Sequence, residues 1–553
     1  MARTAKHAPR KAFDPFELEV VWSRLVAICD EAASDLHRSS FSTIVRENHD
    51  YACMAMDAQG DGLAQSGRSI PSFIGTLPIS VKGFMRKFPP STLRKGDVLI
   101  TNDPWLCTGH LPDITMAVPL FRGRRLIGFA GSIAHMTDIG GRYRSPDSRD
   151  VYEEGLFIPP VKLLEAGRWN PFVAELLERN VRVPEQVLGD VRAMLGACGK
   201  IERRIGELLD EHGLKDLASV GEALKNRSEK AMRAGIRELP GGTYRTEMMV
   251  ESYEPGKPLT LRLALTVKGS EIRADYSGSS PQTRTSLNSV MNYTYAYTCY
   301  GLKCLLSPEV PNNQGAFRPV TVYAPPGCFL NAQRPSAVAA RASAGHYLPA
   351  AVYKALAPAV PERIPGEAGF PFSGFVLSGL DDGGNPYSGI FFFAGGQGAN
   401  PMADGLPNLS FPTNISCIPA EVMEREFPIR VLRQAIRASG GGAGKYRGGD
   451  GQEVAFEMLG ETPARVALVY RRGDYPPLGT AGGGVGQPGE IRLNGGPIPS
   501  GQTFWLGKGD VLALELPGGG GYGDPRQRSR EAVRRDLAND LITRETARDV
   551  YGF

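Results

Sequence analysis

Two short motifs joined by apolar sequence constrain the fold of this chain more than any other feature. His110 stands three residues before Asp113, and His135 stands three residues before Asp138, in a chain with seven histidines. The segment 116–130 between them reads as two apolar strands around a basic turn, which predicts a β-hairpin. A hairpin returns its two ends to the same side, so both motifs would face one point in space.

Imidazole nitrogen together with carboxylate oxygen is a ligand set that suits manganese, iron or zinc. Pro112 lies inside the first motif, which predicts a rigid turn there instead of a helical face. The alternative is that the aspartates only cap backbone groups in turns, as aspartate often does. Two copies of the motif at the ends of one hairpin favour a metal site.

Composition excludes several classes of protein. The 63 basic and 59 acidic residues give a net charge of +4, which provides no reason to expect nucleic acid or an anionic membrane as a partner. No apolar run reaches the roughly 18 residues that a membrane span needs. The basic N-terminus lacks the apolar stretch of a secretory signal, and the eight cysteines are scattered without a C-x-x-C pair. We therefore expect a cytoplasmic protein with reduced thiols.

The N-terminal part of the chain mixes a helix with strands. Asp14 followed by Pro15 and Glu17 is a strong helix start, and an apolar stripe from Leu18 to Ala32 follows it. The charged run 46–50 precedes a buried strand. By itself this run reads as a solvated loop, although it could also direct acid groups such as Asp50 into a site.

Later segments predict a helical block and then a β-rich half. Residues 184–239 suit two long helices interrupted at Gly213, and residues 243–276 alternate as strands do. The chain is rich in glycine after residue 366. We expect an α+β, multi-unit mixed fold: residues 1–183 as an N-terminal metal-site unit, 184–240 as a helical connector, 241–430 as a central αβ unit, and 431–553 as a glycine-rich β unit with C-terminal helices.

Three glycine-rich stretches resemble phosphate-binding loops without meeting their requirements. The stretch 439–446 ends in Tyr446, where a phosphate loop needs the Ser or Thr that holds magnesium. The stretch 484–489 spells G-x-G-x-x-G but contains Pro488 and leads into a strand-like segment. The stretch 517–525 precedes a helix, yet a flexible turn explains it better than an anion site. If the protein serves an ATP-driven reaction, we expect ATP to bind another subunit.

Several segments, in their order and spacing, resemble the hydantoinase B/oxoprolinase family over nearly the whole chain. They are Arg46-Glu-Asn-His-Asp-Tyr-Ala-Cys53, Thr101-Asn-Asp-Pro104, Gly109-His-Leu-Pro-Asp-Ile-Thr115, Ala134-His-Met-Thr-Asp-Ile-Gly-Gly141, Glu154-Gly-Leu-Phe-Ile-Pro-Pro-Val-Lys-Leu163, Ser439-Gly-Gly-Gly-Ala-Gly-Lys-Tyr-Arg-Gly-Gly-Asp-Gly451 and Pro517-Gly-Gly-Gly-Gly-Tyr-Gly-Asp-Pro525. The family includes the B subunits of ATP-dependent hydantoinase, the matching half of 5-oxoprolinase, a lactamase subunit and subunits of acetone and acetophenone carboxylases.

The resemblance implies a hetero-oligomer in which a hydantoinase A-type ATPase binds ATP and magnesium and activates the substrate carbonyl as a phosphate ester. The present chain would carry the divalent metal ion and receive the activated small molecule, a cyclic amide or a ketone. Carried over by position, the metal ligands fall on Asp50, His110, Asp113 and His135. Two carboxylates make a hard, anionic site, which favours manganese over zinc. Asp138 and Glu154 are the expected catalytic side chains, as groups that orient an imidazole or the substrate.

The sequence departs from the family at one place near the expected site. Relatives commonly carry a His-Ile-Pro-Val-His pattern where this chain has Ser69-Ile-Pro-Ser-Phe73, without either histidine. We therefore expect a different choice of substrate. The leading function is an amidohydrolase subunit that opens a hydantoin, 5-oxoproline or lactam. Two alternatives remain open, the corresponding subunit of an ATP-dependent ketone carboxylase and a scaffold whose metal only supports the fold.

Overall fold

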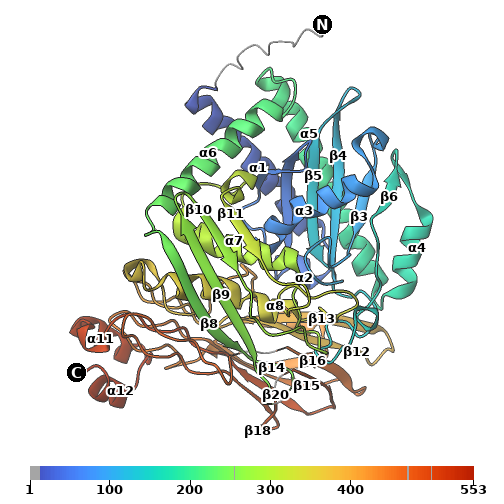
Figure 1. Ribbon diagram of the computed structural model, residues 1–553. Helices are drawn as coiled ribbons and strands as arrows, with labels where there is room; N and C mark the ends of the chain where they lie inside the picture. Colours follow the sequence, from blue (N-terminus) through green and yellow to red (C-terminus); the bar gives the residue numbers. More distant parts are fainter. Residues whose placement is uncertain (1–12, 255, 470–471, 500) are drawn as a thin grey trace.

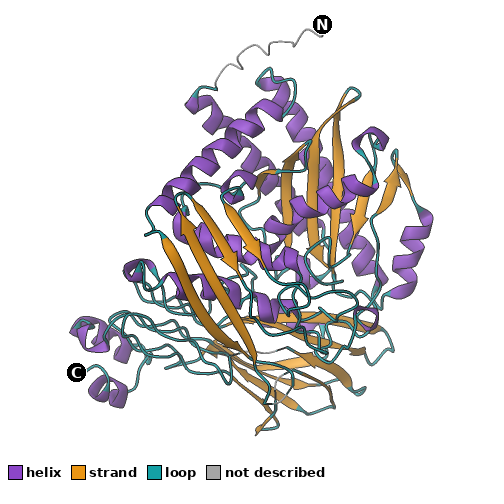
Figure 2. Ribbon diagram, in the orientation of Figure 1, coloured by secondary structure: helices purple, strands orange, loops and turns teal. Residues whose placement is uncertain are grey.

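The computed structural model describes residues 13–254, 256–469, 472–499 and 501–553. It is the mixed α+β protein that the sequence predicts, with several sheets and helices between them (Figures 1 and 2). Among the described residues, every helix is too short or too polar to cross a bilayer.

The N-terminal part of the chain forms a seven-stranded sheet of order β2-β1-β5-β4-β3-β6-β7. Its strands are β1 (Tyr51–Asp57), β2 (Gly62–Gln65), β3 (Val98–Thr101), β4 (Asp113–Arg122), β5 (Arg125–His135), β6 (Val161–Glu165) and β7 (Arg168–Trp169). Its helices are α1 (Pro15–Ser39), α2 (Thr43–Arg46), α3 (Pro71–Lys87), α4 (Pro171–Asn180), α5 (Pro184–Glu211) and α6 (Ala218–Arg237). The predicted hairpin is confirmed, because β4 and β5 pair antiparallel.

Both faces of this sheet are buried, and the alternation along β1 shows how. Tyr51, Cys53 and Ala55 belong to the core under α1 and α5, whereas Met54 and Met56 belong to a second core under α3. Successive side chains of a strand point to opposite faces, so one strand supplies both cores. The start of α1 is as predicted, since the Asp14 carboxylate accepts bonds from the amides of Phe16 and Glu17.

The two long helices expected after residue 184 are also confirmed as α5 and α6. Gly213, with a positive φ of 60°, lies in the turn between them. The two helices do not stand apart from the N-terminal unit. Residues of α5 and α6 share one hydrophobic core with α1 and the sheet. That residues 184–240 act as a separate connector between the N-terminal and central units stays a prediction.

The central part contains a four-stranded sheet of order β11-β10-β9-β8 with helices packed on it. The strands are β8 (Gly242–Val250), β9 (Leu259–Lys268), β10 (Glu271–Asp275) and β11 (Val320–Tyr323), and the helices are α7 (Met291–Leu306), α8 (Arg341–Gly345) and α9 (Tyr347–Leu356). Helix α7 also packs against α3. This contact joins the central unit to the N-terminal sheet (Figure 1).

The remaining chain forms two sheets at the bottom of Figure 1, of order β13-β12-β16-β19 and β14-β15-β20-β17-β18. The strands are β12 (Pro371–Leu380), β13 (Pro386–Ala394), β14 (Ile429–Ile436), β15 (Gln452–Met458), β16 (Ala464–Leu468), β17 (Glu490–Leu493), β18 (Gly496–Pro497), β19 (Gln502–Leu506) and β20 (Val511–Glu515). The helices are α10 (Ala420–Glu426), α11 (Arg530–Ala538) and α12 (Arg544–Asp549). Short 3₁₀ turns occupy Pro90–Thr92, Val151–Glu153, Gln314–Phe317, Pro361–Arg363 and Pro525–Gln527.

The glycine-rich stretches pack against one another, backbone to backbone. The amide of Gly442 donates to the carbonyl of Gly519 at 2.8 Å. The amide of Gly521 donates to the carbonyl of Gly484 at 2.9 Å. A Cβ atom on Gly518 would lie 1.8 Å from the carbonyl oxygen of Gly440. These amides bind neighbouring carbonyls, which is the physical reason that the glycine runs do not form phosphate loops.

Candidate metal centre

The register of the β4–β5 hairpin brings the two motifs together. Asp113 is the first residue of β4 and His135 the last of β5, and the two are direct partners across the strand pair. His110 lies in the turn that leads into β4, and its ring contacts the ring of His135 with centroids 5.1 Å apart. The expectation that the two ends of the hairpin meet therefore holds for these three residues.

One ligand atom from each of His110, Asp113 and His135 lies within 4.8 Å of the others. All three side chains are buried. His110 Nε2 and Asp113 Oδ1 lack a hydrogen-bond partner among the described residues, although His110 Nε2 lies only 2.9 Å from Asp113 Oδ2. Buried polar atoms rarely remain unpaired, so converging, unpaired atoms of this kind fit a cation between them.

The outer nitrogens of both imidazoles are held by backbone carbonyls. His110 Nδ1 lies 3.3 Å from the carbonyl oxygen of Ala339, and His135 Nδ1 lies 2.9 Å from that of Met136. A proton on Nδ1 satisfies each carbonyl and leaves the lone pair of Nε2 directed inward. Histidines that bind metals are usually oriented by such a bond from the other ring nitrogen.

The charge states of the three groups also suit a metal ion. Burial, followed by the Arg341 guanidinium, lowers the pKa of His110 to about 4, and burial lowers the pKa of His135 well below its ordinary value. Burial alone would raise the pKa of Asp113, but His110 in its protonated form and the Arg341 guanidinium outweigh burial and hold the pKa below its usual range. Neutral imidazole and ionised carboxylate are the forms that coordinate metals.

Asp50, the expected fourth ligand, lines the same cavity as the two histidines. It directly precedes β1, and its carbonyl accepts a bond from the amide of His135 at 3.0 Å. Burial, and then the charge of Asp113, raises the pKa of Asp50 to about 8. The group of atoms within 4.8 Å of one another contains the other three residues only, so coordination by Asp50 stays a prediction.

Two buried arginines stand beside the triad, and the sequence motifs gave no sign of either. Arg341 Nη2 donates to Asp113 Oδ2 at 2.6 Å, and the Thr108 hydroxyl donates to the same oxygen. Arg144 Nη1 lies 3.2 Å from His135 Nε2. Arg341 stands more than 200 residues from the hairpin along the chain, so no local pattern could place it here.

The structure gives different surroundings to the two expected catalytic carboxylates. Glu154 Oε1 accepts the amides of Val338 at 2.7 Å and Ala339 at 2.8 Å, and Ala339 is the residue whose carbonyl faces His110. Asp138 instead accepts bonds from Arg182 Nη1 at 2.7 Å and from the amide of Gly140 at 3.2 Å. The lining of the metal cavity includes neither side chain.

The cavity at the triad is small and has mixed walls. Its volume is about 30 Å³, which suits an ion with one or two water molecules. Tyr297 and His346 also line it, and both the Tyr297 hydroxyl and His346 Nε2 are buried without a hydrogen-bond partner in the described chain. Ile70, Ser72 and Phe73 form part of the wall, and they belong to the segment where we expect this chain to differ from relatives.

Fold and site together define an α+β protein with a buried two-histidine, one-aspartate candidate metal centre at the end of a hairpin. The sequence profile of the hydantoinase B/oxoprolinase family matches residues 14–525. The chain belongs to this family. It is 30% identical to the caprolactamase subunit beta of Pseudomonas jessenii, over 98% of this chain and 96% of that protein.

Solved structures agree with this assignment. The crystal structure of the ATP-dependent caprolactamase from Pseudomonas jessenii superimposes with a TM-score of 0.90 at 29% identity, over 98% of this chain and 96% of that chain. A nucleotide-free structure of acetone carboxylase gives a TM-score of 0.85 at 20% identity, over 98% of this chain and 79% of that chain. The second likeness shows a shared fold. The first shows that nearly the whole architecture matches that of an ATP-dependent caprolactamase.

Proposed function

We propose that this protein is the metal-bearing B-type subunit of an ATP-dependent amidohydrolase that opens a cyclic amide, such as a hydantoin, 5-oxoproline or a lactam. The single observation that carries the proposal is the convergence of His110, Asp113 and His135 within 4.8 Å, in a chain of this family. The named activity of the caprolactamase relative supports the amide over the ketone as substrate.

We infer a divalent ion held by the triad, with Asp50 as the fourth ligand. Such an ion polarises a carbonyl and lowers the pKa of a bound water. Carboxylate and imidazole ligands together favour manganese, with iron and zinc as the other candidates. Arg341 keeps Asp113 ionised and fixed in direction, and the carbonyls of Ala339 and Met136 fix the two imidazoles.

The chain's own charges suit an activated, anionic substrate. Arg144 and Arg341 both line the cavity, and each is buried. Guanidinium groups in a site of low dielectric attract phosphate or carboxylate strongly. The Tyr297 hydroxyl and His346 Nε2 face the same small space and offer hydrogen bonds to a single polar group of the substrate that reaches it. Burial lowers the pKa of His346 to about 3, so this imidazole acts as a neutral partner.

Glu154 and Asp138 support the site from outside the cavity in this proposal. Glu154 holds the 338–339 backbone against His110 and is therefore a positioning residue. Asp138, bonded to Arg182, holds the turn that follows β5. We assign contact with the reacting atoms to neither side chain.

A larger cavity adjoins the metal cavity. It has a volume of about 690 Å³ and shares Ile415 with the metal cavity. Ser69, Pro71 and Ile74 line it, and they alternate along the chain with the residues that line the metal cavity. The lining contains amide and hydroxyl side chains and no charged residue. We infer that the neutral ring of the substrate enters here.

The partner in this proposal is a hydantoinase A-type ATPase that binds ATP and magnesium, and the working enzyme is a hetero-oligomer in the cytoplasm. The eight cysteines are free thiols, as a reducing compartment requires. The test is to combine the chain with a co-expressed A-type subunit and to supply ATP with a panel of hydantoins, 5-oxoproline and lactams. ATP-dependent ring opening is expected, and neither subunit alone should turn over.

The same assay separates the alternatives. Bicarbonate-dependent consumption of a ketone, without ring opening, would identify a carboxylase subunit instead. Exchange of the metal for inert ions tests the alternative that the protein is a scaffold whose metal only supports the fold. If partner-dependent turnover survives that exchange while only the melting temperature changes, the metal supports the fold and not the reaction.

A further inference from the structure

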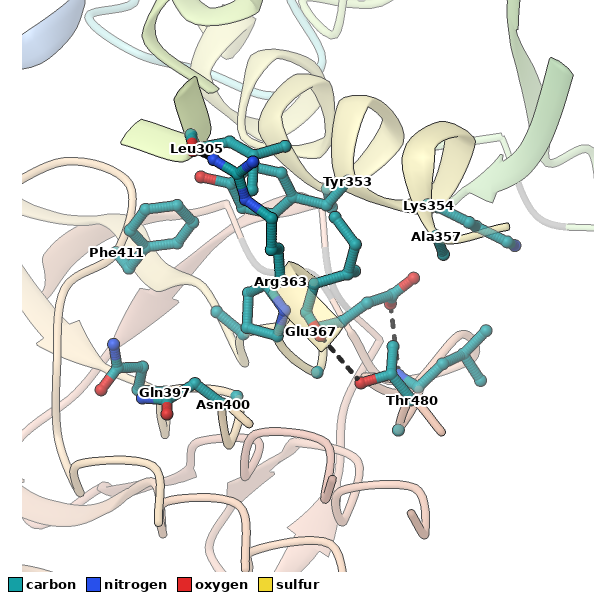
Figure 3. A pocket seen from close by; sticks show the side chains of 18 of the residues that line it. Leu305, Tyr353, Lys354, Ala357, Arg363, Glu367, Gln397, Asn400, Phe411 and Thr480 are labelled. Carbon is teal, nitrogen blue, oxygen red and sulfur yellow. Dashed lines mark hydrogen bonds between the residues drawn. The ribbon is translucent and has the colours of Figure 1, made fainter. Parts of the chain in front are cut away.

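A third cavity lies away from the metal centre, between helix α9 and the glycine-rich segments (Figure 3), and shares Phe411 with the 690 Å³ cavity. Its volume is about 310 Å³, within the range of small-molecule sites in proteins. It shares no lining residue with the metal cavity. Phe370 forms part of its wall, and the edge of that ring contacts His346 of the metal cavity with centroids 6.0 Å apart.

The body of this cavity is apolar and aromatic. Tyr353, Phe370 and Phe411 line it, and the rings of Tyr353 and Phe411 stack at 6.4 Å with an angle of 20° between their planes. Ala350 of α9 and Ala357, directly after α9, add small side chains that leave the space open. Such walls bind a flat or aliphatic group of modest size through the hydrophobic effect.

Two carboxamides provide donors at one side of the cavity. Figure 3 shows Gln397 and Asn400 next to each other, opposite the α9 residues. Gln397 Oε1 accepts the amide of Leu406 at 3.1 Å, and Asn400 Oδ1 accepts the amides of Met402 and Ala403 at 2.8 and 2.9 Å. These bonds fix which end of each carboxamide is oxygen. Both NH₂ groups thus remain as donors, without a bond to the described part of the chain.

The charges around the cavity favour an anionic head group. Arg363 lines it together with Lys354 and one acid, Glu367. Figure 3 shows the Lys354 side chain directed away from Gln397 and Asn400, and its Nζ donates to the carbonyl of Glu247 at 3.1 Å. The Glu367 carboxylate is already bonded to the buried Arg472 at 2.8 Å, which offsets its charge. Arg363 pairs with the exposed Glu238 at 2.9 Å, and exposed pairs of this kind are weak. Arg363 therefore supplies the positive charge of the lining.

We propose that this cavity, lined by Tyr353, Phe370, Phe411, Gln397 and Asn400, binds a small carboxylate with an apolar or aromatic body. The body lies among the three rings, and the carboxylate accepts bonds from Gln397 Nε2 and Asn400 Nδ2. This site is distinct from the metal centre and does not depend on the proposed amidohydrolase function.

The test uses the full chain with phenylacetate as the probe and phenylacetamide as its neutral counterpart, followed by saturation-transfer NMR and titration calorimetry. Phenylacetate should bind saturably and more tightly than phenylacetamide. Gln397→Glu keeps the oxygen that caps Leu406 but replaces the donor with an acceptor, and should weaken phenylacetate binding about tenfold or more. Ala350→Trp fills the cavity and should abolish binding.

Gln65→Glu is the matched control, because it makes the same change in the 690 Å³ cavity and should leave phenylacetate binding unchanged. Circular dichroism confirms that each variant is folded. Absence of saturable binding to the unaltered chain would overturn the proposal. So would equal binding of the two probes, or full binding by folded Gln397→Glu protein.

Discussion

Asp113 is the residue on which the charges of the metal cavity converge. Its Oδ2 atom accepts bonds from Arg341 and Thr108 and lies 2.9 Å from His110 Nε2, while Oδ1 has no partner among the described residues. One carboxylate oxygen is thus fixed by donors, and the other is available to the cation that we propose. The same residue raises the pKa of Asp50, so the two acids do not both ionise freely without an ion between them.

His110→Ala should remove metal and activity together. The substitution deletes one converging ligand atom and leaves Asp113 and His135 to hold the ion alone. We expect metal content, measured by mass spectrometry on dialysed protein, to fall to background, and partner-dependent turnover to fall with it. His212→Ala, at the end of α5, removes a histidine far from the site and should change neither. Full metal occupancy in the His110 variant would refute the ligand assignment.

The Glu154 carboxyl should be protonated in the folded protein near neutral pH, and this makes stability depend on pH. Burial raises its pKa to about 8, against 4.5 for the unfolded chain. The folded state therefore binds more protons between these values, and this group makes folding less favourable as pH rises from about 4.5 to 8. Glu154→Gln mimics the protonated acid and keeps the acceptor for Val338 and Ala339. Thermal unfolding should then lose less stability between pH 5 and 8 than in the unaltered chain, by on the order of a few kcal/mol.

The alanine variant at the same position tests the positioning role. Glu154→Ala releases the 338–339 backbone that orients His110, so metal affinity should fall about 10–100-fold, as for other groups that orient ligands. Glu154→Gln should retain metal affinity at pH 7. A fall of equal size in both variants would show that the charge, and not the hydrogen bonds, is what the site needs.

At the scale of elements, the hairpin explains why part of the site could be predicted. Two apolar runs around a basic turn are a local signal, so the hairpin that returns its two ends to one side could be predicted from the sequence. The register that pairs Asp113 with His135 is seen only in the structure. The family pattern added Asp50, which the charged run alone suggests only as one of two readings. Arg341, His346 and Tyr297 reach the cavity from α7 and the segment around α8, and only tertiary packing brings them there. No spacing in the sequence encodes that contact.

The structural role of the glycine-rich stretches could not be predicted from the sequence. Gly396 approaches the 449 backbone so closely that a Cβ would lie 1.8 Å from the carbonyl oxygen of Gly449. Gly396→Ala should destabilise the chain by about 3 kcal/mol or more, because backbone must move to admit the methyl group. Gly196→Ala, in helix α5 with no atom within 4 Å of the added Cβ, is the matched control and should stabilise by roughly 0.5–1 kcal/mol. Urea unfolding measures both. Equal stability of the two variants would mean that the glycine layers are not closely packed.

At the scale of the whole molecule, the metal cavity joins parts of the chain that the sequence assigns to different units. The ligands come from the N-terminal sheet, Tyr293 and Arg341 from the central part, and Phe392 from β13 beyond it. The largest hydrophobic core likewise takes residues from α1, α2, α4, α5 and α6 and adds Val376, Ile390 and Ala467 from the C-terminal sheets. A boundary at residue 183 therefore passes through a shared core, and the four proposed units need not unfold separately.

Metal binding should then stabilise the molecule as one unit. An ion at a thousand times its dissociation constant adds about 4 kcal/mol to the folded state. For a chain of 553 residues this corresponds to a rise in melting temperature of about 3–4 °C. Calorimetry of the metal-free and metal-loaded protein should show one main transition that shifts as a whole, and no shift in the His110→Ala variant. If the unfolding trace instead contains several transitions and the ion moves only one of them, residues 1–183 form an independent metal-binding domain, and the shared core does not couple it to the remainder of the chain.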